Sequence, residues 1–222
     1  MSDRGEVTRQ RILSVACEEL AQKGPHAIHV HDLIDRMGVT QAMVNYYFGS
    51  RWGLIEAAVL ESYKEYVDAM ISVLEKNLDP VEKIVAWSMA QLEWTAQHPG
   101  ISVVLNYPNL VPEVNFHSGE IYSAIQVVGL RHLDKVVEVV LDAMSKKSGQ
   151  RLDPDKVRVR TATYMWTVLG VSTWNAGQHA PTGKLYNVPK SLLSAQLSDL
   201  AENWLFDKEF MLSAVQNSTV EN

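Results

Sequence analysis

The stretch from Gly38 to Arg51 constrains the fold of this 222-residue chain more than any other. Gly38 can adopt a positive φ and end one helix, and Thr40 can cap the N-terminus of the next. The helix that Thr40 starts, residues 41–47, is too short to be stable alone in water, so one side of it must pack on neighbouring helices. A short capped helix after a glycine turn is typical of the helix-turn-helix of DNA-binding proteins.

The helix predicted for residues 41–47 has two different sides. The positions expected to pack inward are Met43, Val44, Tyr47 and Phe48. The opposite side presents Gln41, Ala42, Asn45 and Tyr46, which suit base edges and phosphates better than a core. This stretch by itself also fits an ordinary helical hairpin in an all-α core, with Tyr46 and Tyr47 as half-buried aromatic residues.

The surrounding sequence favours the DNA-binding interpretation. Motifs follow one another in the order Thr8-Arg9-Gln10-Arg11-Ile12-Leu13 with Ala16, Gly24, Val30-His31-Asp32-Leu33, Gly38-Val39-Thr40, Asn45-Tyr46-Tyr47-Phe48 and Ser50-Arg51-Trp52-Gly53-Leu54. In this order and spacing, residues 7–59 resemble the DNA-binding domain of the TetR family of bacterial repressors. Two positions depart from the family pattern: His29 stands where a capping Ser or Thr is usual, and Ile34 where Ala is usual.

The resemblance implies a homodimeric repressor that binds a palindromic operator in double-stranded DNA and is released by a small effector. Gln41 and Asn45 are the candidates for reading base edges, because side-chain amides pair bidentately with adenine. The residues expected at the DNA backbone are Thr8, His31, Thr40, Tyr46, Tyr47 and Arg51, with Ala42 on the same exposed side.

Charge and composition set limits on the partners. The net charge is −6, yet residues 1–54 contain six Lys or Arg and six Asp or Glu, so the excess negative charge lies in the remainder. Few phosphate contacts and a modest salt dependence of DNA binding follow. No apolar run approaches the roughly 18 residues of a membrane span, the N-terminus lacks the apolar core of a signal peptide, and the single Cys17 suits a reducing compartment. A cytoplasmic protein is expected.

Helical periodicity continues to the end of the chain and predicts an all-α fold. Helices are expected at residues 6–23, 30–37, 41–47, 51–77, 80–97, 101–107, 119–147, 155–178 and 191–215. Residues 1–53 would form the DNA-binding domain and residues 54–222 a helical ligand-binding and dimerisation domain. The last two long helices carry more apolar surface than one buried stripe requires, which favours a homodimer through a four-helix bundle.

The chain shows no motif of an enzyme: it has no Gly-rich phosphate loop, no G-x-S-x-G and no H-E-x-x-H. His26, His29 and His31 are irregularly spaced for one helix face, so neither a metal site nor a cofactor is expected. Residues 54–222 are instead rich in large apolar and amphipathic side chains, which suggest a pocket for an apolar or aromatic molecule. The candidates are Trp87, Gln91, Trp94, Tyr107, Phe116, Tyr122, Met165, Trp166 and Asn175. For each of them an ordinary place in the core is the alternative. Two other functions stay open, a DNA-binding regulator without an effector and a helical binding module with a vestigial head.

Overall fold

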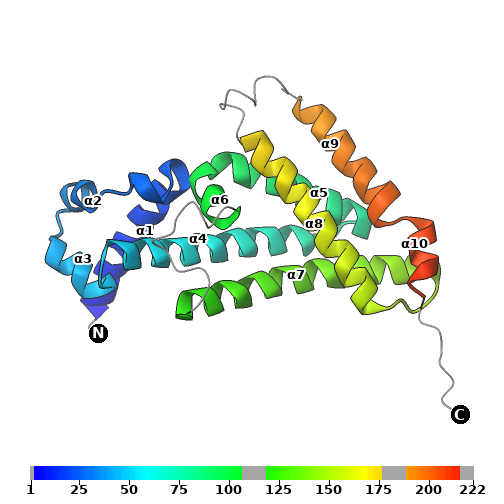
Figure 1. The fold of residues 1–222 in the computed structure, drawn as a ribbon, viewed down its shortest axis with the longest axis horizontal. Helices are drawn as coiled ribbons and strands as arrows, with labels where there is room; N and C mark the ends of the chain where they lie inside the picture. The colour runs from blue at the N-terminus through cyan, green and yellow to red at the C-terminus, as the bar shows by residue number, and fades with distance from the viewer. Residues whose placement is uncertain (1–2, 107–118, 177–188, 216–222) are drawn as a thin grey trace, which may run out of the picture. The chain divides into compact units, whose positions relative to one another are not determined.

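The computed structural model describes residues 3–106, 119–176 and 189–215, and over these ranges the fold is all-α, as predicted (Figure 1). No β-strand occurs in these ranges; Leu152 and Val215 form one isolated bridge. The helices are α1 (Asp3–Lys23), η1 (Pro25–Ala27), α2 (Val30–Met37), α3 (Gln41–Phe48), α4 (Arg51–Leu74), α5 (Pro80–Gln97), α6 (Pro99–Asn106), α7 (Gly119–Ser148), α8 (Pro154–Ala176), α9 (Lys190–Asp199), η4 (Leu200–Leu205) and α10 (Lys208–Ser213).

The packing of these helices divides the chain into two compact units. Unit 1 consists of Met1–Val67 and Trp94–Gly129, and unit 2 of Asp68–Glu93 and Leu130–Asn222. Helices α4, α5 and α7 therefore each contribute residues to both units. The domain boundary expected after residue 53 is a division by function, and it stays a prediction.

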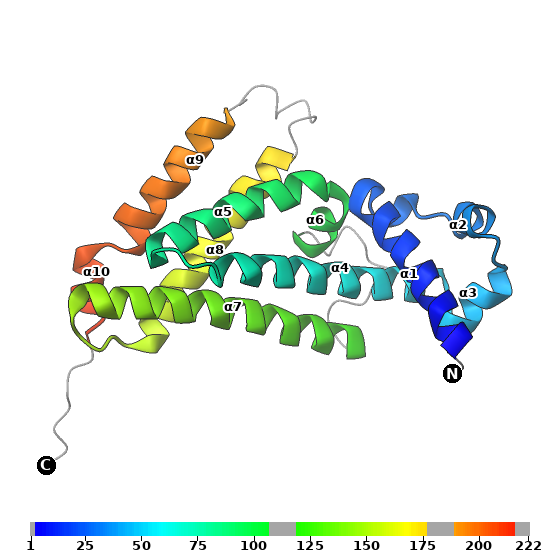
Figure 2. The same cartoon turned by 180° about the vertical axis from the view of Figure 1, so that it is seen from behind.

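Unit 1 has a continuous apolar core that holds the helix-turn-helix in place. Its buried members are Ile12, Leu13, Ala16, Leu20, Ile28, Leu33, Val44, Leu54, Ile55, Ala58, Val59, Ile101 and Val104. They come from α1, α2, α3, α4 and α6, with Ile28 between η1 and α2, and α6 packs directly against α1 (Figure 2). Val44 is the one fully buried residue of α3, and the half-buried Tyr47 and Phe48 pack against the same core.

Unit 2 has polar pairs inside an otherwise apolar core. The indole Nε1 of Trp87 donates to Nε2 of His132 over 3.0 Å, and the hydroxyls of Ser88 and Tyr164 lie 2.8 Å apart. Burial, reinforced by the nearby Arg131 guanidinium, lowers the pKa of His132 to about 4, so the ring is neutral at pH 7. Burial also raises the pKa of Tyr164 to about 12.

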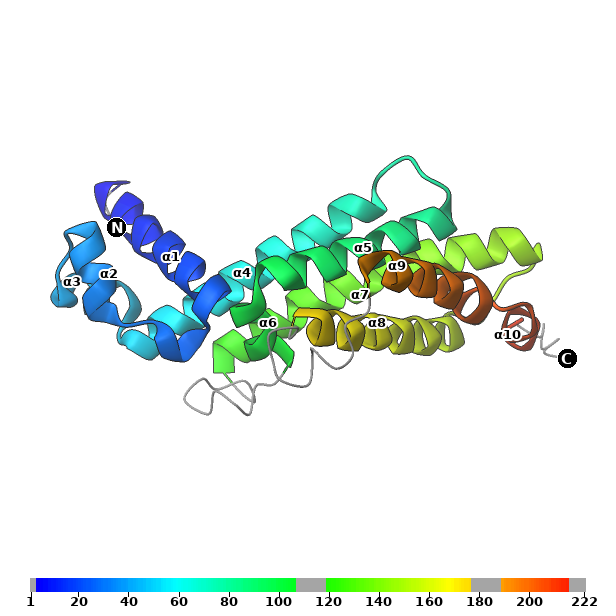
Figure 3. The same cartoon turned by 90° about the horizontal axis from the view of Figure 1, so that it is seen from above.

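The expectation of one unbroken helix over residues 191–215 is wrong. Helix α9 continues into the π-helical η4, the chain then becomes extended at Asp207, and α10 begins (Figure 3). The carboxylate of Asp207 caps α10 by accepting from the Phe210 backbone N–H over 2.8 Å.

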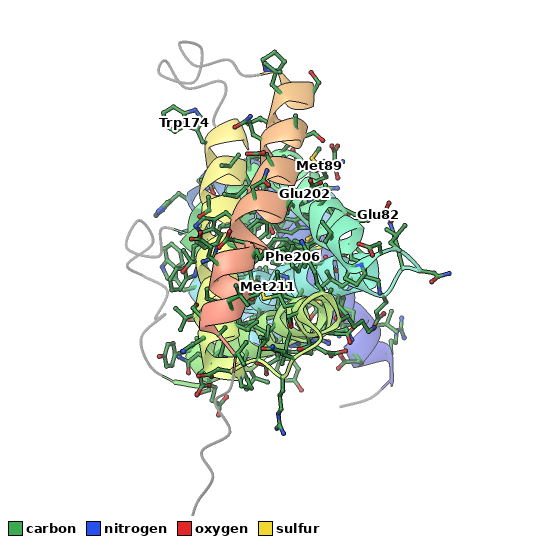
Figure 4. The ribbon with its side chains drawn as sticks, turned by 90° about the vertical axis from the view of Figure 1, so that its right-hand side faces the viewer. Glu82, Met89, Trp174, Glu202, Phe206 and Met211 are labelled. Carbon is green, nitrogen blue, oxygen red and sulfur yellow. The ribbon has the colours of Figure 1, made fainter. Side chains whose placement is uncertain are left out.

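Arg160 of α8 holds the two sides of this break together. Its guanidinium lies over the Trp204 ring at 4.3 Å and the Phe210 ring at 4.1 Å, and its Nε donates to the Trp204 carbonyl over 2.9 Å. The break also buries Phe206 and Met211, labelled in Figure 4. Helix periodicity in the sequence gives no sign of these contacts, because Arg160 is more than forty residues away from its partners.

None of the helices within the described ranges combines the length and the hydropathy needed to cross a membrane.

Candidate nucleic-acid interface

The turn between α2 and α3 is built by Gly38 and Thr40. Gly38 adopts φ 65° and ψ 32°, and its N–H donates to the Ile34 carbonyl over 2.9 Å, which ends α2. Thr40 has extended backbone, and its Oγ1 accepts from the Met43 N–H over 3.3 Å. Both roles agree with the sequence prediction, and together they set the direction in which α3 leaves the turn.

Helix α3 is two-sided, as predicted. Val44 is fully buried, while Met43, Tyr47 and Phe48 are half-buried. The side facing away from the core consists of Gln41, Ala42, Asn45 and Tyr46, all exposed, with Tyr46 at 77%. An exposed aromatic ring among polar side chains, on a helix anchored from behind, is a surface available for contact with a partner.

The two amides on this surface contact each other. Nε2 of Gln41 donates to Oδ1 of Asn45 over 3.0 Å, across one turn of α3. Their spacing of four in the sequence is the signal for this bond.

Aromatic and basic side chains pack along the edge of α3. The rings of Tyr46 and Tyr47 lie 5.1 Å apart at 75°, an edge-to-face contact that supports the exposed ring with a half-buried one. The guanidinium of Arg9 in α1 lies 5.3 Å from the Phe48 ring centroid. Thr8, also in α1, is half-buried, and its hydroxyl donates to the Arg4 carbonyl over 3.0 Å.

The start of α4 comes close to the end of α3. Oγ of Ser50 accepts from the Gly53 N–H over 3.0 Å, so Ser50 caps α4. A Cβ at residue 53 would lie 2.0 Å from the Phe48 carbonyl oxygen, so this position has room only for glycine.

Arg51 does more in the structure than its predicted contact with phosphate. Its Nε donates to the Ile28 carbonyl over 2.8 Å, and its Nη2 lies within hydrogen-bond distance of the carbonyls of Pro25 and His26. These bonds fasten the segment between α1 and α2 to the N-terminus of α4. The phosphate contact stays a prediction.

Two histidines lie at the beginning of α2. His29 makes no side-chain capping bond, as its poor capping chemistry suggested. The side chain of His31 is 85% exposed, and its Nε2 lies 3.7 Å from the Asp35 carboxylate. The described part of the chain has no group of three or more His, Cys, Asp or Glu that could hold a metal ion.

This local arrangement agrees with a comparison against known families. Residues 12–58 match the family model of bacterial regulatory proteins, tetR family. These residues are a TetR-family DNA-binding domain. The part that matches runs from α1 into α4 and includes the whole turn with α3, so a TetR-family helix-turn-helix occupies this part of the chain.

Solved structures of TetR-family regulators share the fold over nearly the whole chain. A regulator from Streptomyces coelicolor has a TM-score of 0.64 at 14% identity, with 94% of this chain and 90% of that chain covered. The fatty acid degradation regulator FadR from Bacillus halodurans has a TM-score of 0.62 at 18% identity, with 89% and 95% covered. FadR from Bacillus subtilis in complex with stearoyl-CoA has a TM-score of 0.60 at 16% identity, with 86% and 96% covered. A search of curated proteins finds no match.

The effector-site candidates are distributed over both units. In unit 2, Trp87 and Gln91 are buried, Met165 is half-buried and Trp166 is 70% exposed. In unit 1, Trp94 is half-buried and stacks on His98 with ring centroids 4.3 Å apart, and Tyr122 accepts a hydrogen bond from Gln126. Tyr107, Phe116 and the side chain of Asn175 lie outside the described residues. A common pocket therefore stays a prediction.

Proposed function

We propose that this protein is a repressor that binds a palindromic operator as a homodimer, with α3 of each protomer in the major groove. The observation that carries the proposal is the outward face of α3, where two amides and a 77%-exposed tyrosine project from a helix that is capped by Thr40 and anchored by Val44. In helix-turn-helix proteins the N-terminal residues of such a helix contact base edges, and half-sites lie about one helical turn apart.

Each contact residue has one expected role in this complex. Gln41 and Asn45 face the bases, since amides match the donor and acceptor pattern of adenine. The residues that face the sugar-phosphate backbone and set the register are Thr8, His31, Thr40, Tyr46, Tyr47 and Arg51, with Ala42 beside them. Because residues 1–54 have no net charge, the affinity should fall less steeply with salt than that of a basic DNA-binding protein.

A homodimer is supported by apolar surface on α8 and α9. Val159 is 68% exposed, Trp166 70% and Leu192 56%. Trp174, labelled in Figure 4, lies two turns beyond Trp166 on the same helix and is 51% exposed. Side chains of this size gather on a surface where a partner covers them, and a second copy of α8 and α9 would complete a four-helix bundle.

The effector is proposed to be a small apolar or aromatic molecule. Large apolar side chains dominate the interior of unit 2, and the FadR of Bacillus subtilis, similar in fold, was crystallised with stearoyl-CoA, a ligand with a long apolar chain. Binding would shift the population away from the conformation whose two heads fit the operator, so effector and DNA would weaken each other reciprocally.

The test is fluorescence anisotropy of the purified protein with duplexes selected from a randomised pool. The expected result is tight, sequence-selective binding with two protomers per site. Tyr46→Ala should lower the affinity for every sequence and leave thermal stability unchanged, while Val127→Ala, a control at a 68%-exposed position of α7, should leave both unchanged. Equal and weak binding to all sequences would contradict the proposal.

A further inference from the structure

The hydrogen bond between Gln41 and Asn45 joins the two side chains expected to read DNA. Gln41 is the first residue of α3, directly after the Thr40 cap, and Asn45 follows one turn later. Both side chains are exposed, so neither is needed for the core. Water could satisfy both of these exposed amides. The bond between them therefore matters for how the two side chains are oriented toward a partner.

The bond leaves Gln41 with the groups that adenine requires. An amide NH₂ has two hydrogens, and donation to Asn45 Oδ1 uses one of them. Oε1 and the second N–H remain, and these are the acceptor and the donor that match N6–H and N7 of adenine in the major groove. Rotation of the Gln41 amide would exchange acceptor and donor, and the bond to Asn45 opposes that rotation.

The same bond gives Asn45 a role different from that of Gln41. Its Oδ1 accepts from Gln41 Nε2 through one of the oxygen's two lone pairs, and this bond restricts the rotation that a bidentate contact of Asn45 with a base of its own would require. Its NH₂ group can still donate to a phosphate oxygen or another acceptor nearby.

We propose that Gln41 and Asn45 act as one reading unit, in which Gln41 contacts one adenine in each half-site and Asn45 is the positioning residue that orients the Gln41 amide. This inference rests on the proposed function and adds the division of work between the two amides. Two amides that read independently would discriminate at two different base pairs, whereas a coupled pair discriminates at one.

The experiment measures base discrimination for a set of variants. The best duplex from the selection is varied symmetrically at each base pair of the half-site, and anisotropy is recorded for wild type, Gln41→Ala, Asn45→Ala, the double variant and Asn45→Asp. We expect wild type to prefer adenine at one position by about tenfold or more. Gln41→Ala and Asn45→Ala should both lose the preference at that same position, and the double variant should lose no more than Gln41→Ala alone.

Asn45→Asp separates positioning from direct contact. The carboxylate still accepts from Gln41 Nε2, so the adenine preference should be retained, while the added negative charge near phosphates lowers the affinity for every sequence. Melting temperatures should stay near the wild-type value in all variants, because both positions are exposed.

Two results would overturn the inference while the proposed function stands. In one, Asn45→Ala relaxes a different base pair from Gln41→Ala; in the other, Asn45→Ala binds more tightly with the preference intact, which would mean that the intrahelical bond competes with DNA. A wild-type protein that prefers no sequence would instead overturn the proposed function and this inference with it.

Discussion

Acid should destabilise this protein through the buried imidazole of His132. The ring is 4% exposed and accepts the Trp87 indole N–H, and burial lowers its pKa from 6.5 to about 4. Between these two values the unfolded chain binds a proton that the folded chain does not. The contribution of His132 to the free energy of unfolding therefore has its full value above pH 6.5 and decreases as the pH falls toward 4.

The size of the effect follows from the two pKa values. A single group with these two pKa values lowers the free energy of unfolding by about 2 kcal/mol between pH 8 and pH 5. The loss is on the order of 3 kcal/mol once the pH is below both pKa values. For a chain of this length, 2 kcal/mol corresponds to a change in melting temperature of about 4–8 °C.

The assay compares thermal unfolding of wild type and His132→Gln at pH 8 and pH 5, followed by circular dichroism. Gln can accept from the Trp87 N–H but does not titrate, so its melting temperature should fall by about 4–8 °C less than that of wild type. His31→Gln, at a side chain that is 85% exposed, is the matched control and should keep the wild-type pH dependence. Parallel decreases in wild type and His132→Gln would refute the reasoning.

Three further predictions concern the helix-turn-helix, each measured by urea or thermal unfolding. Gly53→Ala should cost about 2 kcal/mol or more of stability, because its Cβ would lie 2.0 Å from the Phe48 carbonyl oxygen. The control is Gly170→Ala in α8, where a Cβ meets nothing within 4 Å; it should stabilise the protein by about 0.5–1 kcal/mol. Equal effects of the two substitutions would contradict the steric argument. Thr40→Ala should cost about 1 kcal/mol through the lost cap, and Thr40→Ser should restore most of it. Val44→Ala should cost about 2 kcal/mol of stability, because it removes two buried methyl groups and leaves a space. A loss below about 0.5 kcal/mol would mean that other residues anchor α3.

Much of the helix-turn-helix was predictable because its determinants are local. Gly38, Thr40 and Ser50 make their structural bonds to residues three or four positions away, as helix ends require. The bond between Gln41 and Asn45 has the same short range. The all-α fold and the two sides of α3 could therefore be inferred before any tertiary contact was known.

Other features depended on residues far apart in the chain. The end of α9 was predicted too late, because Arg160 binds on both sides of the break from another helix. Arg51 was assigned only to phosphate, because nothing in its neighbourhood indicates the carbonyls of residues 25–28 as partners. The surplus apolar content of the last long helices was recognised, but only the structure separated the exposed Trp166 from the buried Tyr164 two positions earlier.

The sequence by itself determined where helices begin and end around the DNA-binding turn, and which family of proteins it resembles. The tertiary structure alone decided which large side chains are buried, that Trp87 donates to a neutral His132, and that Arg51 and Arg160 hold distant segments. The physical reason is range: caps and amphipathic faces act within a turn or two of helix, whereas burial and its pKa shifts arise only when segments distant in sequence pack together.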